Sequence, residues 1–174
     1  MDGSSSKFPS DSFLDVTAGN TRFVSRFGFQ DLTGWAARGL AIVTCMDSRI
    51  DPLQIVGMAP GDVKILRNAG ARVTDDVVRT LILASYLLGV NRVLVMPHTN
   101  CRMSGTTESA IHENIATEFG VDTRSIEFRT VTDQIAALAY DVTRLRSHPL
   151  LPAGLVVAGA RYNVETGVLE PQDV

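Results

Sequence analysis

The sequence predicts an α/β protein with a mostly parallel central sheet flanked by helices. Three short apolar runs, at residues 40–44, 93–96 and 155–160, hold a single polar side chain, Thr44, as expected of strands buried on both faces. Segments with a helical period lie between these runs, and such alternation is typical of a parallel sheet with helices on its faces. The length of 174 residues suits one domain with its own core.

The N-terminal region differs in composition from the rest of the chain. Residues 1–10 are polar and rich in serine, and we expect a disordered tail there. A single domain is expected to fill residues 11–174. Its first part, residues 11–27, has apolar positions in an interrupted helical pattern, which predicts one or two short helices as an N-terminal arm.

The next elements are a strand, a second strand and a helix. The first buried strand is expected at residues 40–44, and a turn of Pro, Gly and Asp introduces a second at 63–66. Thr74 or Asp75 can cap a helix whose apolar positions keep the helical period to about residue 88, where Gly89 ends it.

The second half of the chain continues the alternation. The third buried strand is expected at residues 93–96 and the fourth at 155–160. The other expected elements are a helix at 104–119 closed by Gly120, an extended segment at 126–131, a helix at 133–145 and a terminal hairpin at 161–169 on a sheet edge.

Composition and charge exclude several classes of function. The net charge is −3 and the basic residues are scattered, which argues against a nucleic-acid partner. No run of about 18 apolar residues exists, so no membrane span is expected. The N-terminus lacks the pattern of a secretory signal, and we therefore expect the reducing cytoplasm as its location. There, two cysteines suit metal binding or catalysis better than a disulfide, although a disulfide stays open as an alternative.

Both cysteines and one histidine follow buried strands directly. Cys45 comes after the first strand, and His98 and Cys101 come after the third. If the first strand is central, the first and third strands are neighbours about 4.8 Å apart. Ligands of open α/β sheets bind beyond the carboxyl ends of the strands, where the winding direction reverses. We therefore expect these three side chains to meet there.

The donor types favour zinc. Two thiolates and an imidazole are soft or borderline ligands, which suit zinc better than magnesium or calcium. Three protein ligands leave a fourth position open, as in catalytic zinc sites. Asp47 is close enough in sequence to compete for that position, and Arg49 can hold Asp47 in a charge-assisted pair. The other histidines, His112 and His148, are expected at the surface.

At these residues the sequence resembles the β-carbonic anhydrases. Their two signatures are Cys-x-Asp-x-Arg and His-x-x-Cys, matched by residues 45–49 and 98–101. The similarity continues through residues 60–62, 67–70 and 86–90, and covers residues 35–115 well. The details around Cys45 resemble the compact archaeal and actinobacterial subgroup, and the chain lacks the bicarbonate-holding glutamine of the plant type.

The resemblance implies the fold, activity and assembly of that family. It implies zinc-dependent, reversible hydration of carbon dioxide to bicarbonate and a proton. It implies that Asp47 either ligates zinc, closing the site, or pairs with Arg49, opening it. Asn68, Ala69 and Gly70 are implied to contact the substrate. Homodimers are implied, with the N-terminal helix laid across the partner, and dimers can pair into tetramers.

The chain departs from the family pattern at three positions near the second signature. Arg102 stands where the family usually has Gly, Pro97 precedes His98, and Asn100 replaces a frequent Asp. The metal ligands are retained, while turnover is open to question. Two alternatives therefore stay beside carbonic anhydrase activity: hydrolysis of carbon disulfide or carbonyl sulfide, and a non-catalytic zinc-binding or sensor protein of the same fold.

Overall fold

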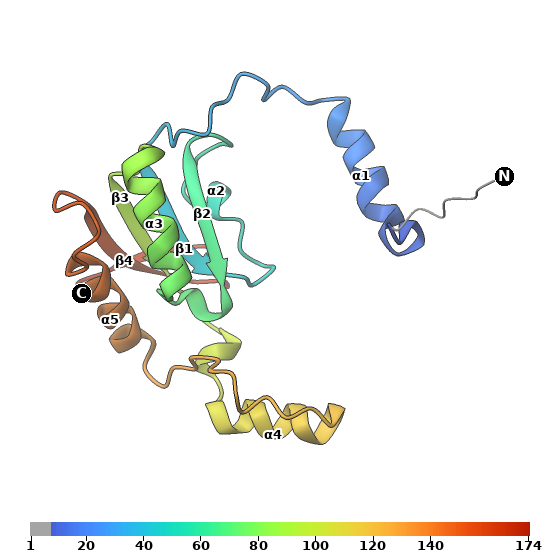
Figure 1. The fold of residues 1–174 in the computed structure, drawn as a ribbon, viewed down its shortest axis with the longest axis vertical. Helices are drawn as coiled ribbons and strands as arrows, with labels where there is room; N and C mark the ends of the chain where they lie inside the picture. Colours follow the sequence, from blue (N-terminus) through green and yellow to red (C-terminus); the bar gives the residue numbers. More distant parts are fainter. Residues whose placement is uncertain (1–7) are drawn as a thin grey trace. The chain divides into compact units, whose positions relative to one another are not determined.

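The computed structural model describes residues 8–174, which form two compact units divided between Thr33 and Gly34 (Figure 1). Residues 1–7 of the predicted disordered tail lie outside the described residues. The first unit contains a 3-10 helix, η1 (Ser10–Phe13), followed by α1 (Leu14–Val24). The expectation of one or two short helices in this part of the chain is thus confirmed.

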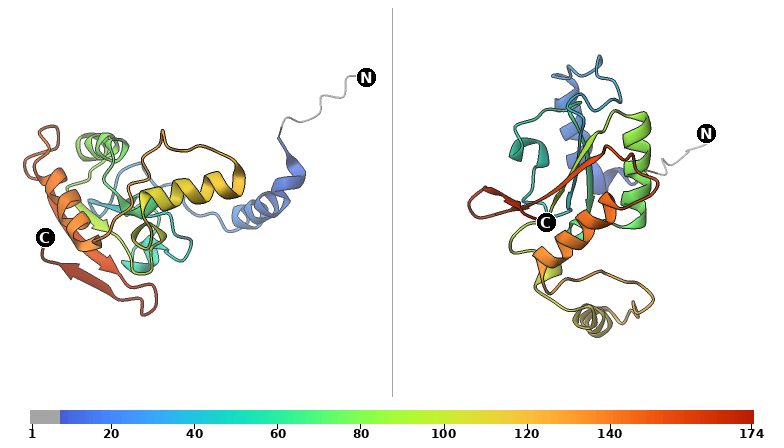
Figure 2. Two further views of the ribbon diagram at one scale, coloured as in Figure 1. Left: turned by 90° about the horizontal axis from the view of Figure 1, so that it is seen from below. Right: turned by 90° about the vertical axis from the view of Figure 1, so that its left-hand side faces the viewer.

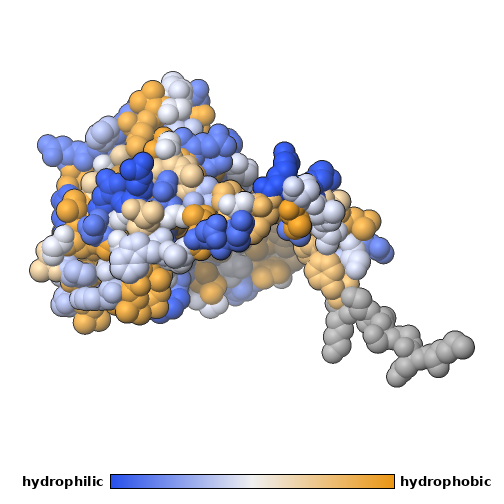
Figure 3. Space-filling view, turned by 90° about the horizontal axis from the view of Figure 1, so that it is seen from above, coloured by the Kyte–Doolittle hydropathy of each residue, from blue (hydrophilic) through white to orange (hydrophobic). Residues whose placement is uncertain are grey.

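The first unit exposes its apolar side chains. None of the residues of α1 is buried, and apolar side chains show between the polar ones on its surface (Figure 3). The rings of Phe23, Phe27 and Phe29 contact one another, with centroids 5.6–6.4 Å apart. This small aromatic cluster holds the end of α1 against the residues that follow it.

The second unit is built on a five-stranded sheet in the order β2-β1-β3-β4-β5. Its strands are β1 (Leu40–Cys45), β2 (Val63–Asn68), β3 (Arg92–Met96), β4 (Val156–Tyr162) and β5 (Leu169–Gln172). The first four strands are parallel, and β5 pairs antiparallel with β4, which confirms the predicted edge hairpin. β1 lies between β2 and β3, which meets the condition under which the first and third buried strands were expected to be neighbours.

Four helices and two 3-10 turns connect these strands. They are α2 (Pro52–Ile55), η2 (Ala69–Ala71), α3 (Asp75–Leu87), η3 (Arg102–Ser104), α4 (Glu108–Phe119) and α5 (Gln134–Arg146). Side chains cap two long helices: Thr74 accepts from the Val77 N–H, as the sequence predicts, and Asp133, which was expected inside the helix, accepts from two N–H groups of α5. Every helix in the described part of the chain is too short or too polar to cross a membrane.

Helices lie on both sides of the sheet (Figures 1 and 2), and an apolar layer packs on each of its faces. Alternate side chains of β1 and β3, such as Val43 and Val95, pack against α3 and α5 on one face. The opposite side chains, such as Ile42 and Met96, pack against η3 and the region of α2. Because β1 is fully buried from Leu40 to Cys45, its last residue enters the site already fixed in position.

Two sequence-based expectations are wrong in detail. The helix expected from Ser104 starts only at Glu108, because Arg102–Ser104 form η3 and Thr107 caps α4. The extended segment expected at 126–131 joins no strand of the sheet. Its alternating apolar residues resemble a strand, but Arg129 has a φ of 61°, which breaks an extended path.

Candidate metal centre

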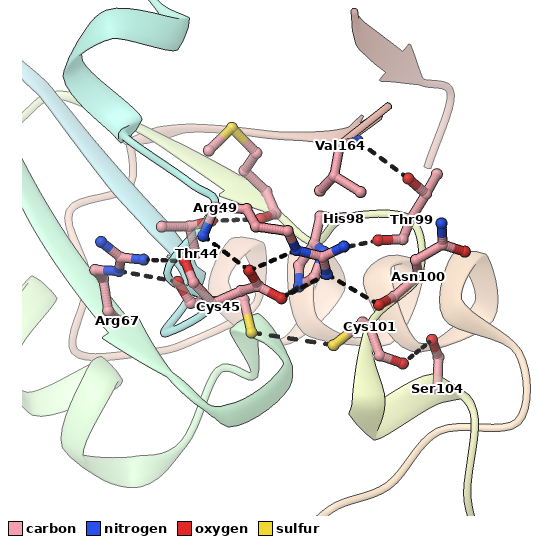
Figure 4. Close-up of polar contacts among 12 residues, drawn as sticks. Thr44, Cys45, Arg49, Arg67, His98, Thr99, Asn100, Cys101, Ser104 and Val164 are labelled. Carbon is pink, nitrogen blue, oxygen red and sulfur yellow. Dashed lines mark hydrogen bonds and ion pairs between the residues drawn. The ribbon is translucent and has the colours of Figure 1, made fainter. Parts of the chain in front are cut away.

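The three predicted metal ligands meet at the carboxyl ends of β1 and β3 (Figure 4). Their donor atoms all lie within 4.8 Å of one another, and each residue is buried. The Cys45 and Cys101 sulfurs are 4.0 Å apart, and both cysteines are free, so the alternative disulfide is not formed. Two sulfurs bound tetrahedrally to one zinc at about 2.3 Å stand roughly 3.8 Å apart, which matches this spacing.

The imidazole of His98 is held in the orientation that metal ligation requires. Its Nδ1 lies 2.8 Å from the Thr99 carbonyl oxygen, which makes Nδ1 the protonated nitrogen. The other nitrogen, Nε2, is fully buried and has no hydrogen-bond partner among residues 8–174. A buried lone pair without a partner is costly unless an ion binds it. Together with the two thiols, it fits a soft divalent cation such as zinc.

The protonation of the two thiols is linked. The hydrogen bond from the Cys101 thiol lowers the pKa of Cys45, and His98 and the Gly70 backbone N–H act in the same direction against the effect of burial. The same pairing, together with burial, raises the pKa of Cys101. Burial opposes the protonation of His98, but the Cys45 sulfur, the Thr99 carbonyl and the Asp47 carboxylate together outweigh it and raise the pKa of that imidazole. These surroundings therefore stabilise negative charge on the Cys45 sulfur.

Asp47 and Arg49 form a bidentate ion pair beside these ligands. The Arg49 Nε and Nη2 donate to the two Asp47 carboxylate oxygens at 2.9 and 2.7 Å, and the Arg49 backbone N–H donates at 3.0 Å. These bonds hold the pKa of Asp47 well below its usual range. The nearer carboxylate oxygen lies 3.7 Å from His98 Nε2, but Asp47 stands outside the three-residue ligand group. The predicted Asp47–Arg49 pair is thus present, and the ligation of metal by Asp47 stays a prediction.

Neighbouring strands and helices fix the backbone of these ligands. Arg67 on β2 donates to the carbonyl oxygens of Cys45 and Asp47 at 2.9 and 2.7 Å (Figure 4). Gln134, at the start of α5, donates to the His98 carbonyl at 2.8 Å. Sequence reasoning did not assign a role to either residue. The position of Arg67 near the end of a strand beside β1 could have indicated its contact with the site. Gln134 lies 36 residues from His98, and nothing in the sequence indicates their contact.

The loop after β2 carries the three residues expected to contact substrate. Asn68 uses both ends of its amide locally: Nδ2 donates to the Arg72 carbonyl at 2.7 Å, and Oδ1 accepts from the Arg72 N–H at 2.8 Å. Gly70 has a φ of 81°, and a Cβ there would lie 3.2 Å from Met103. Asn68 and Gly70 therefore shape the wall of the site, and substrate contact by Asn68, Ala69 and Gly70 stays a prediction.

The three departures from the family pattern occupy different environments. Pro97 is buried, and its carbonyl accepts from the Tyr162 N–H at 2.9 Å, so it joins the loop to β4. Arg102 is exposed at the start of η3. Asn100 adopts a left-handed backbone, with a φ of 54°, between the two ligands of the second signature.

The remaining histidines lie outside this ligand group, as expected. The His112 side chain is 16% exposed, which is less than predicted, because its Nδ1 contacts the Thr123 hydroxyl at 2.8 Å and its ring lies against Phe128. His148 is partly exposed and accepts from the Leu150 N–H at 3.3 Å.

Comparisons of this chain with a family model and with known proteins all indicate the same family. A family model described as carbonic anhydrase matches residues 40–127. The putative carbonic anhydrase YvdA of Bacillus subtilis is 33% identical, and the match covers 91% of this chain and 90% of that protein. β-Carbonic anhydrase 1 of Mycobacterium tuberculosis is 32% identical over 89% of this chain and 94% of its own.

The chain is also similar to solved structures and to relatives that are named for a second activity. The crystal structure of carbonic anhydrase from Streptococcus mutans superposes with a TM-score of 0.86 at 35% identity, covering 91% of this chain and 96% of that one. A carbon disulfide hydrolase from Acidianus sp. strain A1-3 is 30% identical over 74% of each chain. The relatives therefore include proteins named for two different linear substrates.

Proposed function

Because this chain belongs to the β-carbonic anhydrase family, we propose that it binds zinc and catalyses the reversible hydration of carbon dioxide to bicarbonate and a proton. One observation carries the proposal: the Cys45, His98 and Cys101 donors converge, and His98 Nε2 is buried without a partner among the described residues. A structural zinc site would use a fourth protein ligand, whereas this set has three.

Each residue of the site has a role in this proposal. Cys45, His98 and Cys101 hold the ion. Bound zinc supplies the Lewis acidity that brings the ionisation of water near neutral pH. Arg49 keeps the Asp47 carboxylate ionised and turned to itself, and Asp47 Oδ2 then stands ready to accept a proton or a hydrogen bond beside the metal position.

Two measurements on the purified protein test the proposal. Metal analysis should find about one zinc per chain, as three convergent ligands require. Stopped-flow measurement of carbon dioxide hydration should show turnover that rises with pH toward 9. Protein that carries zinc but gives no hydration between pH 7 and 9 would instead support the non-catalytic zinc-binding alternative.

Hydrolysis of carbon disulfide is the second candidate, favoured by the relatives named for that activity. Carbon disulfide is linear and apolar like carbon dioxide, and the same ligand set could serve both substrates. Assaying the zinc-loaded protein for hydrogen sulfide release from carbon disulfide separates the two. Sulfide release without carbon dioxide hydration would reverse the assignment.

The proposal includes a homodimer, able to pair into a tetramer, that works in a reducing cytoplasm. The exposed apolar side chains of α1 support the dimer, because a helix without buried residues needs a packing surface. The two free cysteines support the location, because a reducing compartment keeps both thiols available as ligands.

A further inference from the structure

The β4–β5 hairpin runs beside the loop that carries two metal ligands. The Tyr162 N–H donates to the Pro97 carbonyl, and the Thr99 N–H donates to the Tyr162 carbonyl, both at 2.9 Å. The Val164 N–H then donates to the Thr99 hydroxyl at 3.1 Å (Figure 4). These three bonds extend the pairing of β3 and β4 past the end of the sheet, so the hairpin and the ligand loop move together.

Asn100 joins this hairpin to the Asp47–Arg49 pair. Its Nδ2 donates to Glu165 Oε1 at 2.7 Å, and its carbonyl oxygen accepts from Arg49 Nη2 at 3.1 Å. Arg49 Nη2 is the same nitrogen that holds Asp47 Oδ2 at 2.7 Å. The orientation of the Asn100 peptide therefore sets the position of the carbonyl that Arg49 Nη2 contacts in addition to Asp47. Through Arg49, it influences the position of the Asp47 carboxylate.

The turn fixes the backbone of Glu165. The Asn163 side-chain oxygen accepts from the N–H groups of Glu165 and Thr166 at 2.9 and 3.2 Å. Gly167, with a φ of 75°, closes the turn. Asn100 has a left-handed backbone that costs free energy in a residue with a side chain, and its bond to Glu165 offsets part of that cost.

We propose that Glu165 is a positioning residue for the Asp47–Arg49 pair, acting through the Asn100 peptide. Glu165 holds Asn100 in its left-handed conformation, Asn100 presents its carbonyl to Arg49, and Arg49 holds the Asp47 carboxylate in its paired orientation beside His98. The catalytic part of this inference rests on the proposed carbon dioxide hydration, whereas the geometric part does not.

Three variants of the full-length protein test the inference. Glu165→Ala removes the acceptor, and Glu165→Gln keeps an acceptor oxygen but removes the charge. Glu170→Ala is the matched control: Glu170 lies on the same hairpin and pairs with Arg161 at 2.8 Å, without touching the ligand loop. We expect Glu165→Ala to lower kcat/KM for carbon dioxide about five-fold, the factor that one lost hydrogen bond gives. Glu165→Gln should restore most of it, and Glu170→Ala should match the wild type.

A second readout does not depend on turnover. The Arg49 backbone N–H donates to Asp47 Oδ1, so its NMR amide signal reports whether the carboxylate is held. That signal should shift in Glu165→Ala and stay in place in the other two variants. If no protein hydrates carbon dioxide but the Arg49 signal shifts, the proposed function fails and the positioning role stands. An unchanged Arg49 signal in Glu165→Ala, or an equal shift in Glu170→Ala, would overturn the inference.

Discussion

Two Asp-x-Arg pairs in this chain share one geometry and differ in their surroundings. Asp122 and Arg124 make the same three contacts as Asp47 and Arg49, at 3.0, 2.9 and 2.7 Å. The Asp122–Arg124 pair is largely exposed, whereas the Asp47 side chain is 20% exposed and lies beside a buried imidazole. The spacing favours the ion pair in both places. Of the two, it is the Asp47–Arg49 pair that lies beside two thiols and an imidazole and has a further acceptor, the Asn100 carbonyl.

This likeness provides a matched pair of variants. Arg49→Ala should keep its zinc but lose about ten-fold in the rate of carbon dioxide hydration, because it removes a charge-assisted pair that orients Asp47. Arg124→Ala removes an equivalent pair far along the chain and should keep the wild-type rate. Stopped-flow kinetics on zinc-quantified protein measures both. Equal rates in the two variants would show that Arg49 does not serve the reaction.

His98 and His148 provide a second comparison. His98→Asn keeps a polar side chain but loses the nitrogen that points at the two sulfurs, so the protein should lose most of its zinc. His148→Asn changes a residue outside the ligand group and should retain about one zinc per chain. Metal analysis after dialysis, with circular dichroism to check folding, decides between them. Full zinc content in His98→Asn would remove His98 from the ligand set.

At the scale of elements, a buried ion pair ties α5 to the loop beside the metal ligands. Asp141 is 2% exposed, and its carboxylate accepts from Arg72 Nε at 2.7 Å and from the Val73 N–H at 3.2 Å. Asp141→Asn leaves the partly buried Arg72 without a counter-ion and should cost about 3 kcal/mol in the free energy of unfolding. Asp76→Asn breaks the exposed Asp76–Arg79 pair and should cost less than about 0.5 kcal/mol. Urea unfolding measures both, and equal costs would contradict the structural role of Asp141.

The Glu108 carboxylate binds backbone N–H groups of the segment at 126–131, which in a strand would bond to a neighbouring strand. It accepts from the backbone N–H of Phe128 and, at 3.3 Å, from that of Thr130, and these bonds lower its pKa below the ordinary value of 4.5. The folded state therefore favours the ionised form. The stabilisation is complete above pH 4.5 and is lost as the pH falls through the lowered folded pKa.

The pH dependence of two amide signals checks this account. The NMR shifts of the Phe128 and Thr130 amides should change together in mild acid, and Glu108→Gln should shift them already at neutral pH. Glu113→Gln, later on the same helix, should leave them in place. If the Phe128 and Thr130 signals change neither in acid nor in Glu108→Gln, other contacts hold the segment at 126–131.

The elements that were predictable from sequence are those set by local signals. Buried strands such as β1 show as continuous apolar runs, and the cap at Thr74 marks a helix start directly. The segment at 126–131 was misleading, because an apolar alternation looks the same whether a strand partner or Glu108 satisfies its backbone. The convergence of Cys45, His98 and Cys101 could be predicted because they follow two neighbouring strands. The contacts of Gln134 and Glu165 with this loop leave no pattern in the sequence.

At the scale of the whole molecule, the N-terminal unit carries the proposed dimer contact. The exposed fractions of Phe23 and Phe27 are 47% and 49%. Phe23→Asp places a charge where a partner surface would bury a ring, and should convert the dimer to a monomer in sedimentation velocity. Leu150→Asp adds the same charge at an exposed apolar position of the second unit and should leave the dimer intact. An unchanged sedimentation coefficient in Phe23→Asp would contradict the proposed contact.

The pairing of β1 with β3 has a consequence for how the chain reaches its native state. Thr44 faces Met96, and its hydroxyl donates to the Met96 carbonyl at 2.8 Å. A slip of two residues would move one strand by about 6.6 Å and take Cys45 beyond the reach of an ion held by the other two donors. Zinc would then add its binding free energy only to chains with the correct strand register. Zinc binding would thus favour the correct register of β1 and β3 during folding, in addition to its proposed role in catalysis.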